Sequence, residues 1–255
     1  GLVLGPALGG VLVGLFGKSM SYAVGTGFAL LAAATLLAMP VSEPALKQQR
    51  GPIFASIAEG ARFVAGNQIM LGAMALDMFS VLLGGAVSML PAFIKDILHA
   101  GPEALGLLRA APAIGSIAVA LWLTRRPLQR NAGRILLLAV AAFGICTIAF
   151  ALSRNLWLSA VILVLYGACD GVSVVLRSTI MQLVTPDEMR GRVSSINGIF
   201  VSSSNELGAF YDGVMARLLT LVPAIIVGGC VTLGVVGITA KLAPRLRKLD
   251  IRELQ

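Results

Sequence analysis

The stretch ILLLAVAAFGICTIAFALS, residues 135–153, decides the fold class. Its 19 residues carry no charged side chain, and the run ends at Arg154 and Asn155. A helix needs about 20 mostly apolar residues to cross the hydrocarbon core of a bilayer. Because this run has that length and no charge, it predicts a membrane-spanning helix.

The composition of the whole chain points the same way. Hydrophobic residues make up 57% of the 255 residues and charged residues 13%, whereas soluble domains carry roughly 25% charged residues. A soluble fold cannot hide that much apolar surface and still cover itself with charge. The three cysteines are widely spaced and there is one histidine, so we expect no disulfide framework, metal site, cofactor or enzyme nucleophile. The class predicted is an all-α membrane protein with many spans.

Eight apolar runs are long enough, or nearly so, to be spans. They are residues 1–16, 20–39, 69–94, 104–124, 135–153, 156–183, 194–216 and 221–241. Residues 40–67 differ: a polar linker with prolines precedes IFASIAEGARFVAGNQ, whose apolar residues recur at helical spacing. This pattern predicts an amphipathic helix on the membrane surface.

These runs predict four segments. Residues 1–40 hold the last two helices of an N-terminal half, 41–67 a cytoplasmic linker with the amphipathic helix, 68–243 a C-terminal half of six helices, and 244–255 a cytoplasmic tail. The chain starts at Gly1 inside an apolar run. We therefore expect about eight helices of a probable twelve, although any helical bundle with a central linker would satisfy this layout.

Lysine and arginine predict the orientation. Fourteen of them fall in one set of alternate loops and four in the other, while Arg109 and Arg177 lie within predicted spans. Because cytoplasmic loops are enriched in Lys and Arg, the linker and the C-terminus are predicted to be cytoplasmic. The net charge of +8 then reflects topology, with anionic lipid headgroups rather than nucleic acid as the partner.

Carboxylates within the spans are the first functional candidates. Burying a carboxylate in a bilayer costs about 3 kcal/mol on insertion scales, so such residues usually line cavities. Asp77, Asp170 and Glu206 are predicted to lie deep, and Arg109, Arg177 and Asp212 near the membrane surfaces. The seven residues DMFSVLL from Asp77 match DGVSVVL from Asp170 at four positions. The match predicts equivalent places on two cavity-lining helices, or it is a coincidence of an apolar alphabet.

Two readings of these carboxylates stay open. Carboxylates in an apolar setting can carry protons, or a neighbouring Ser, Asn or Arg can hold them in a structural role. The polar midsection of the run 194–216 likewise either binds substrate or hydrogen-bonds neighbouring helices. Candidate substrate contacts are Asn205 and Ser204, with Ser80 and Ser173 from the repeated motif.

Two motifs resemble a known family. The opening GLVLGPALGG looks like the antiporter motif in the fifth helix of major facilitator superfamily exporters; the matching residues are Gly1, Gly5, Pro6, Gly9 and Gly10. The run RGRVSSINGIF, residues 190–200, followed by SNELG, 204–208, resembles the enterobactin-exporter-like, or transmembrane secretion effector, branch of that superfamily. The family's charged loop between the eighth and ninth helices is only partly kept here, since Arg125, Arg126 and Arg134 are present without its Asp. Arg190 and Arg192 open the second motif.

The resemblance implies a transporter with two rocking halves. We expect a proton-coupled exporter of a small molecule such as a siderophore or a drug, acting as a monomer in the cell membrane. Asp77, Asp170 and Glu206 would handle protons, and Asn205 and nearby serines would contact substrate. An importer of the same fold, or a membrane partner protein that transports nothing, are the alternatives.

Overall fold

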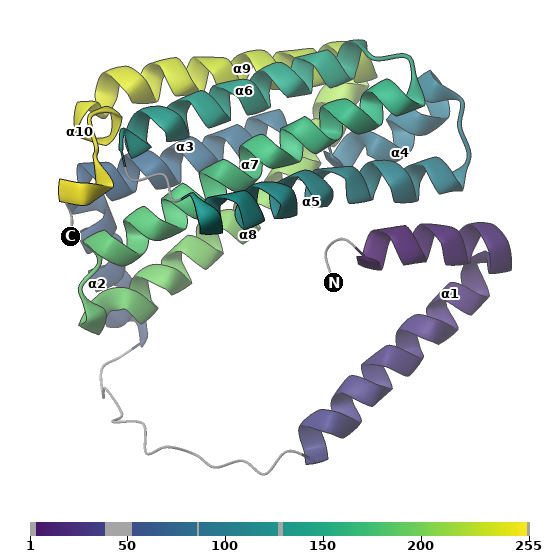
Figure 1. Ribbon diagram of the computed structural model, residues 1–255, viewed down its shortest axis with the longest axis horizontal. Helices are drawn as coiled ribbons and strands as arrows, with labels where there is room; N and C mark the ends of the chain where they lie inside the picture. Colours follow the sequence, from purple (N-terminus) through teal and green to yellow (C-terminus); the bar gives the residue numbers. More distant parts are fainter. Residues whose placement is uncertain (1–3, 39–52, 86, 127–129, 254–255) are drawn as a thin grey trace.

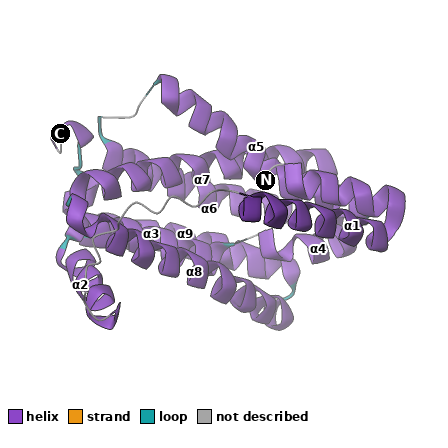
Figure 2. Ribbon diagram, turned by 90° about the horizontal axis from the view of Figure 1, so that it is seen from below, coloured by secondary structure: helices purple, strands orange, loops and turns teal. Residues whose placement is uncertain are grey.

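The computed structural model describes residues 4–38, 53–85, 87–126 and 130–253. Within these ranges every regular element is a helix (Figure 2), which confirms the predicted all-α class. The longer helices are α1 (Leu4–Ala38), α2 (Ile53–Gly66), α3 (Gln68–Gly84), α5 (Pro102–Arg125), α6 (Ala132–Leu152), α7 (Leu156–Val184), α8 (Arg190–Leu219) and α9 (Leu221–Leu242). Short helical turns are α4 (Leu90–Phe93), α10 (Pro244–Arg247), η1 (Val87–Met89), η2 (Ile94–Leu98), η3 (Asp187–Met189) and η4 (Ile251–Glu253).

Six stretches of the described residues are long and apolar enough to cross a membrane. They are Ser19–Ala38, Gln68–Leu98, Glu103–Arg125, Ala132–Leu152, Leu156–Val184 and Leu221–Leu242. Helix α8 is not among them, although its 30 residues extend about 45 Å at 1.5 Å per residue. Its serines, Asn205 and Glu206 lower its hydropathy, so the predicted span 194–216 is confirmed as a helix and its crossing of the bilayer stays a prediction.

The N-terminal segment differs from the prediction of two separate helices. Residues Leu4–Ala38 form one continuous α1, and the expected interruption between 1–16 and 20–39 is instead a bend within it (Figure 1). The first part of α1 runs beside α5 and the second part diverges from the bundle. Residues Ser19–Ala38 are 0% buried within the chain, so this apolar surface faces outward.

The predicted span 69–94 is also not a single helix. Asn67 caps α3, because its side-chain oxygen accepts hydrogen bonds from the backbone N–H groups of Ile69 and Met70 at 3.0 and 3.2 Å. Helix α3 then ends at Gly84, and the chain continues through the short elements η1, α4 and η2. The interruption turns the polypeptide before α5 begins at Pro102.

Helix α2 lies where the amphipathic helix is predicted after the linker, and its apolar residues pack partly on protein. Val64 is buried with Val193 and Ile196 of α8, whereas Ile57 of the same helix is exposed. Glu59 of α2 forms an ion pair of 2.5 Å with Arg192 of α8. The helix is therefore attached to the start of α8 in addition to any membrane contact.

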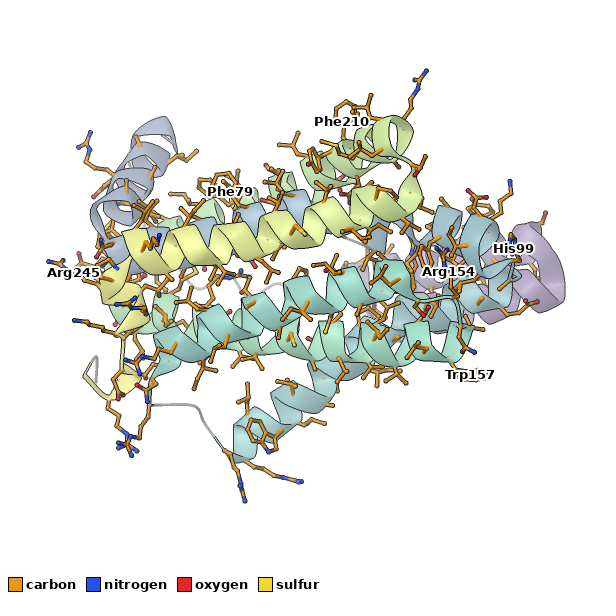
Figure 3. The ribbon with its side chains drawn as sticks, turned by 90° about the horizontal axis from the view of Figure 1, so that it is seen from above. Phe79, His99, Arg154, Trp157, Phe210 and Arg245 are labelled. Atoms are coloured by element: carbon orange, nitrogen blue, oxygen red, sulfur yellow. The ribbon has the colours of Figure 1, made fainter. Side chains whose placement is uncertain are left out.

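The helices lie roughly along one axis, with α2 and α10 at one end of the bundle (Figure 1). His99, Arg154 and Trp157 lie at the opposite end from Arg245, while Phe79 and Phe210 project from the sides (Figure 3). Buried apolar residues form one cluster around Phe93, Phe150 and Leu163. A second cluster, around Leu136 and Leu246, lies toward α10.

The backbones of α5 and α7 are in close contact. A side chain added at Gly115 of α5 would collide with the backbone carbonyl of Val164, and one added at Gly167 of α7 would collide with that of Pro112. Gly171 lies one turn further along and faces Ser116. Gly167 and Gly171 form a small-xxx-small pattern, which lets the backbones of two helices approach closely.

We predict that Gly167→Val destabilises the protein by about 1–3 kcal/mol, the range typical of overpacking. The added atoms have no space because the neighbouring group is backbone. Thermal unfolding of the purified protein in detergent measures the change. Gly237→Ala is the control, since nothing lies within 4 Å of the added Cβ. Equal effects of the two substitutions would contradict the close α5–α7 contact.

Candidate functional site

One narrow pocket brings together four of the seven proton and substrate candidates. Asp77 and Ser80 reach it from α3, and Asp170 and Ser173 from α7. Val140 and Phe143 of α6 also line it; they belong to the two different apolar clusters. The pocket therefore lies where the clusters meet, and the two copies of the repeated motif face one another across it.

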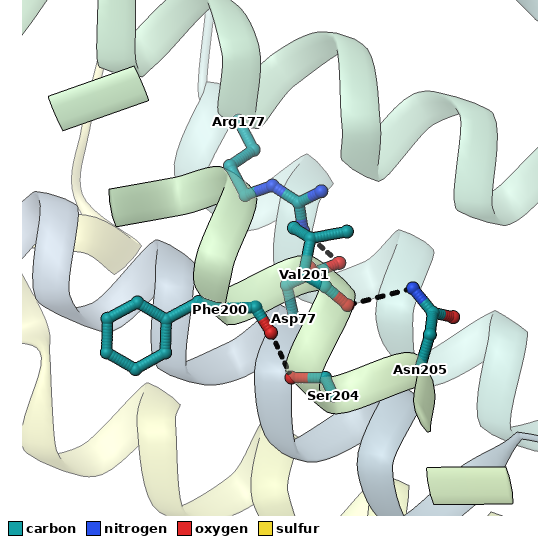
Figure 4. A network of polar contacts seen from close by, with 6 residues as sticks. All are labelled: Asp77, Arg177, Phe200, Val201, Ser204 and Asn205. Carbon is teal, nitrogen blue, oxygen red and sulfur yellow. Dashed lines mark hydrogen bonds and ion pairs between the residues drawn. The ribbon is translucent and has the colours of Figure 1, made fainter. Parts of the chain in front are cut away.

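Asp77 is held by an ion pair with Arg177 (Figure 4). The two side chains are only 11% and 7% exposed. Helices α3 and α7 run in opposite directions (Figure 1), so Asp77, nine residues after Gln68, and Arg177, seven residues before Val184, lie at similar depth. The prediction that Arg177 sits at the membrane surface is wrong, because the carboxylate provides a counter-charge inside the bundle.

Asp170 differs from Asp77 in having no cationic partner among the described residues. It is partly buried and lines the pocket beside Cys169. The hydroxyl of Ser80 also lines the pocket, is buried, and has no hydrogen-bond partner among the described residues. The pocket thus contains one neutralised carboxylate, one carboxylate without a counter-charge and one unsatisfied hydroxyl.

The thiol groups in this region are closer together than the sequence indicates. Cys169 of α7 lies beside Cys146 of α6, and both cysteines are partly buried. Their separation of more than 20 residues hides this contact in the sequence. The two thiols pack against the apolar cluster around Phe150, so they add small side chains to the α6–α7 contact.

The candidates on α8 are not in this pocket. Asn205 and Glu206 are exposed, and the Asn205 amide donates to the carbonyl oxygen of Val201 at 2.9 Å (Figure 4). Ser204 is buried, and its hydroxyl donates to the carbonyl oxygen of Phe200 at 2.6 Å. Helix α8 therefore turns Ser204 toward the bundle and presents Asn205 and Glu206 on its outer side.

Asp212 is a second buried carboxylate, and its predicted position near the membrane surface is wrong. It was predicted to reach water near the outer end of its span, but it is 5% exposed. The hydroxyl of Ser88 donates to Asp212, and Gly208, one turn earlier on α8, packs on the backbone of Val81 and Leu82. Asp212 thus ties α8 to the interruption that follows α3.

The remaining candidates lie away from the pocket. Gly1 is outside the described residues, and Gly5, Pro6, Gly9 and Gly10 fall in α1. Arg125 and Arg126 end α5 and are exposed. Arg190 pairs with Asp187 at 2.7 Å, Arg192 pairs with Glu59, and Arg134 lies at the start of α6. No His, Cys, Asp or Glu cluster suited to a metal ion occurs in the described part of the chain.

The comparisons with known proteins agree with this helical architecture. The model of the transmembrane secretion effector family, within the major facilitator superfamily, matches residues 2–255. The chain belongs to this family. The family assignment confirms the resemblance based on residues 190–208, and it identifies the bundle as part of a multi-pass membrane protein.

Several curated proteins are similar to this member of the transmembrane secretion effector family. The enterobactin exporter of Citrobacter koseri is 27% identical over 240 residues, which cover 90% of this chain and 55% of that protein. The enterobactin exporters of Escherichia coli and Shigella boydii are each 26% identical over 223 residues, covering 86% of this chain and 52% of those proteins. The chain therefore spans about half the length of these relatives.

We predict that Asp77→Asn destabilises the protein by about 3–5 kcal/mol, because Arg177 is left as an uncompensated buried charge. Arg177→Met should have a similar effect by isolating Asp77. The double variant should lose less stability than the sum of the two, by at least about 1 kcal/mol. Unfolding in detergent measures all three.

Glu206→Gln is the matched control for this cycle. It also removes one carboxylate charge from a helix, but the side chain is exposed, so we expect a change within about 0.5 kcal/mol. Strictly additive effects of the two substitutions at the ion pair would show that Asp77 and Arg177 do not depend on each other.

Proposed function

We propose that the chain is part of a proton-coupled exporter of a small molecule, in which Asp170 is the group that exchanges the proton. The observation that carries this proposal is the pocket in which Asp170 faces the Asp77–Arg177 pair. Both carboxylates were candidates from sequence. Only Asp170 can gain and lose a proton without breaking an ion pair, because Asp77 already has its counter-charge.

The pocket suits a proton better than a substrate molecule. About 10 Å³ is open to the centres of water molecules, which is room for about one water. Ser80 and Ser173 offer hydroxyl groups that can pass a proton between such a water and Asp170. In this proposal the two serines therefore serve the proton path, and the substrate binds elsewhere.

The substrate site is proposed to include the outer side of α8. Asn205 and Glu206 are exposed there, and lipid is a poor environment for an amide and a carboxylate. A water-filled path between two halves of a transporter would accommodate both. Asn205 would then contact substrate, and Glu206 would bind either a second proton or a cationic group of the substrate.

Export, rather than import, is supported by the relatives, which are named as enterobactin exporters. A siderophore or another small molecule is thus the proposed substrate class. Alternating access would move α8 relative to a second set of helices around a central site. The arginine-rich end of the bundle, with α2 and α10, is proposed to face the cytoplasm of a monomeric transporter in the cell membrane.

We predict that Asp170→Asn, in the intact transporter, abolishes efflux driven by a pH gradient and leaves exchange of labelled substrate across vesicles without a gradient. The amide keeps the shape of the side chain but cannot take up a proton. Flux into and out of proteoliposomes with and without an imposed pH gradient measures the two activities. Asp170→Glu should restore part of the gradient-driven flux.

Asp96→Asn is the control, because Asp96 is exposed in η2 and does not line the pocket. It should leave both activities unchanged. Full gradient-driven efflux by the Asp170→Asn variant would disprove the role of Asp170. Loss of both gradient-driven flux and exchange would assign Asp170 to substrate transport as a whole instead of to proton coupling.

A further inference from the structure

The C-terminal segment is fixed onto the start of α6. The backbone N–H of Gly133 donates to the carbonyl oxygen of Leu249 at 3.3 Å. A side chain at Gly133 would collide with the carbonyl of Leu246, so the two backbones are in direct contact. Leu246 and Leu249 are buried with Leu136 in one apolar cluster. The position of α10 relative to α6 is therefore set by packing and does not depend on arginine side chains.

This contact places two arginines beside one another. Arg134 of α6 and Arg247 of α10 line a cleft of about 390 Å³ together with Leu137 and Leu138. Both arginines are exposed, and neither forms an ion pair with a carboxylate among the described residues. Asp250 lies nearby in the chain, but its carboxylate accepts from the backbone N–H of Arg252 at 3.1 Å.

The two arginines indicate what kind of ligand the cleft would bind. Arg134 lies in the first turn of α6, and Arg247 is the last residue of α10. Two guanidinium groups thus reach one cleft, and guanidinium groups match the geometry of phosphate oxygens well.

The apolar part of the cleft indicates which phosphate would bind. Leu138 is 68% exposed and lies one turn after Arg134 along α6, in the direction of the membrane interior. We propose that this cleft binds an anionic phospholipid, with its headgroup phosphate on Arg134 and Arg247 and an acyl chain along Leu138. A soluble phosphate would use the arginines but would gain nothing from the leucine.

Native mass spectrometry of the purified protein in detergent tests this site. We expect phosphatidylglycerol to be retained in preference to phosphatidylcholine. In the double variant R134A/R247A its retention should fall roughly tenfold or more, because each basic residue near an anionic lipid strengthens its binding. R134K/R247K should fall in between, because lysine keeps the charge without the planar fork.

The matched control is R125A/R126A. It removes the same charge from exposed residues at the end of α5. These residues do not line the cleft, so a lipid held there does not contact them, and retention should change less than about twofold because only the general surface attraction is lost. An equal loss in both double variants would overturn the site, because it would show a general charge effect. Circular dichroism of each variant verifies that it is folded.

Two further measurements separate a lipid from free phosphate. Leu138→Gln should weaken phosphatidylglycerol retention without any change in charge, because it disturbs only the acyl-chain contact. Inorganic phosphate at millimolar concentration should not displace the lipid. Displacement by phosphate, together with no effect of Leu138→Gln, would overturn the lipid assignment in favour of a soluble anion.

Discussion

A charge buried among apolar helices is costly unless a counter-charge lies beside it, and this constraint organises the centre of the bundle. Arg177 meets it by pairing with Asp77 across α3 and α7. Taking both charges out of water is costly, and their attraction offsets that cost only when they stay together. The pair therefore fixes the relative rotation and depth of two helices that carry the functional candidates, which apolar packing alone would leave less specific.

The pocket next to this pair is the site that we propose exchanges the proton. It lies at the junction of two apolar clusters, so few polar groups are available there to hydrogen-bond a buried carboxylate. Asp77 is paired with Arg177, whereas Asp170 has no cationic partner and the Ser80 hydroxyl no hydrogen-bond partner among the described residues. In the proposed mechanism, this arrangement separates a structural charge from a titratable one within a single site.

Hydropathy predicted most of the fold. The bounds of the five helices from α5 to α9 were predicted to within about four residues. Apolar runs bounded by charge are a strong signal in membrane proteins. The resemblance at 190–208 also identified the family. Interruptions were harder to foresee, because the sequence stays largely apolar on both sides of the bend in α1 and of the end of α3 at Gly84.

The candidate site was predictable in its residues and less so in its pairing. The repeated motif predicted equivalent places for Asp77 and Asp170, and both residues line one pocket. Arg177 and Asp212 were predicted near the membrane surfaces because each lies near an end of its span. That prediction failed because the distance from a helix end does not show which side of the helix a residue occupies. Comparing the depth of Asp77 on α3 with that of Arg177 on the antiparallel α7 would have suggested the pair. Ser88, the partner of Asp212, gave no signal in the sequence.

The connection between α8 and α9 has a mechanical consequence. A single residue, Thr220, joins the two helices, and its backbone is in the left-handed region at φ 68°. Because the connection is one residue long, α8 cannot move along its axis without also moving the start of α9. Helix α9 in turn is packed closely on α6, where Gly229 meets the backbone of Gly144. A movement of the outer side of α8 would therefore be transmitted through α9 to α6, the helix whose Val140 and Phe143 line the pocket.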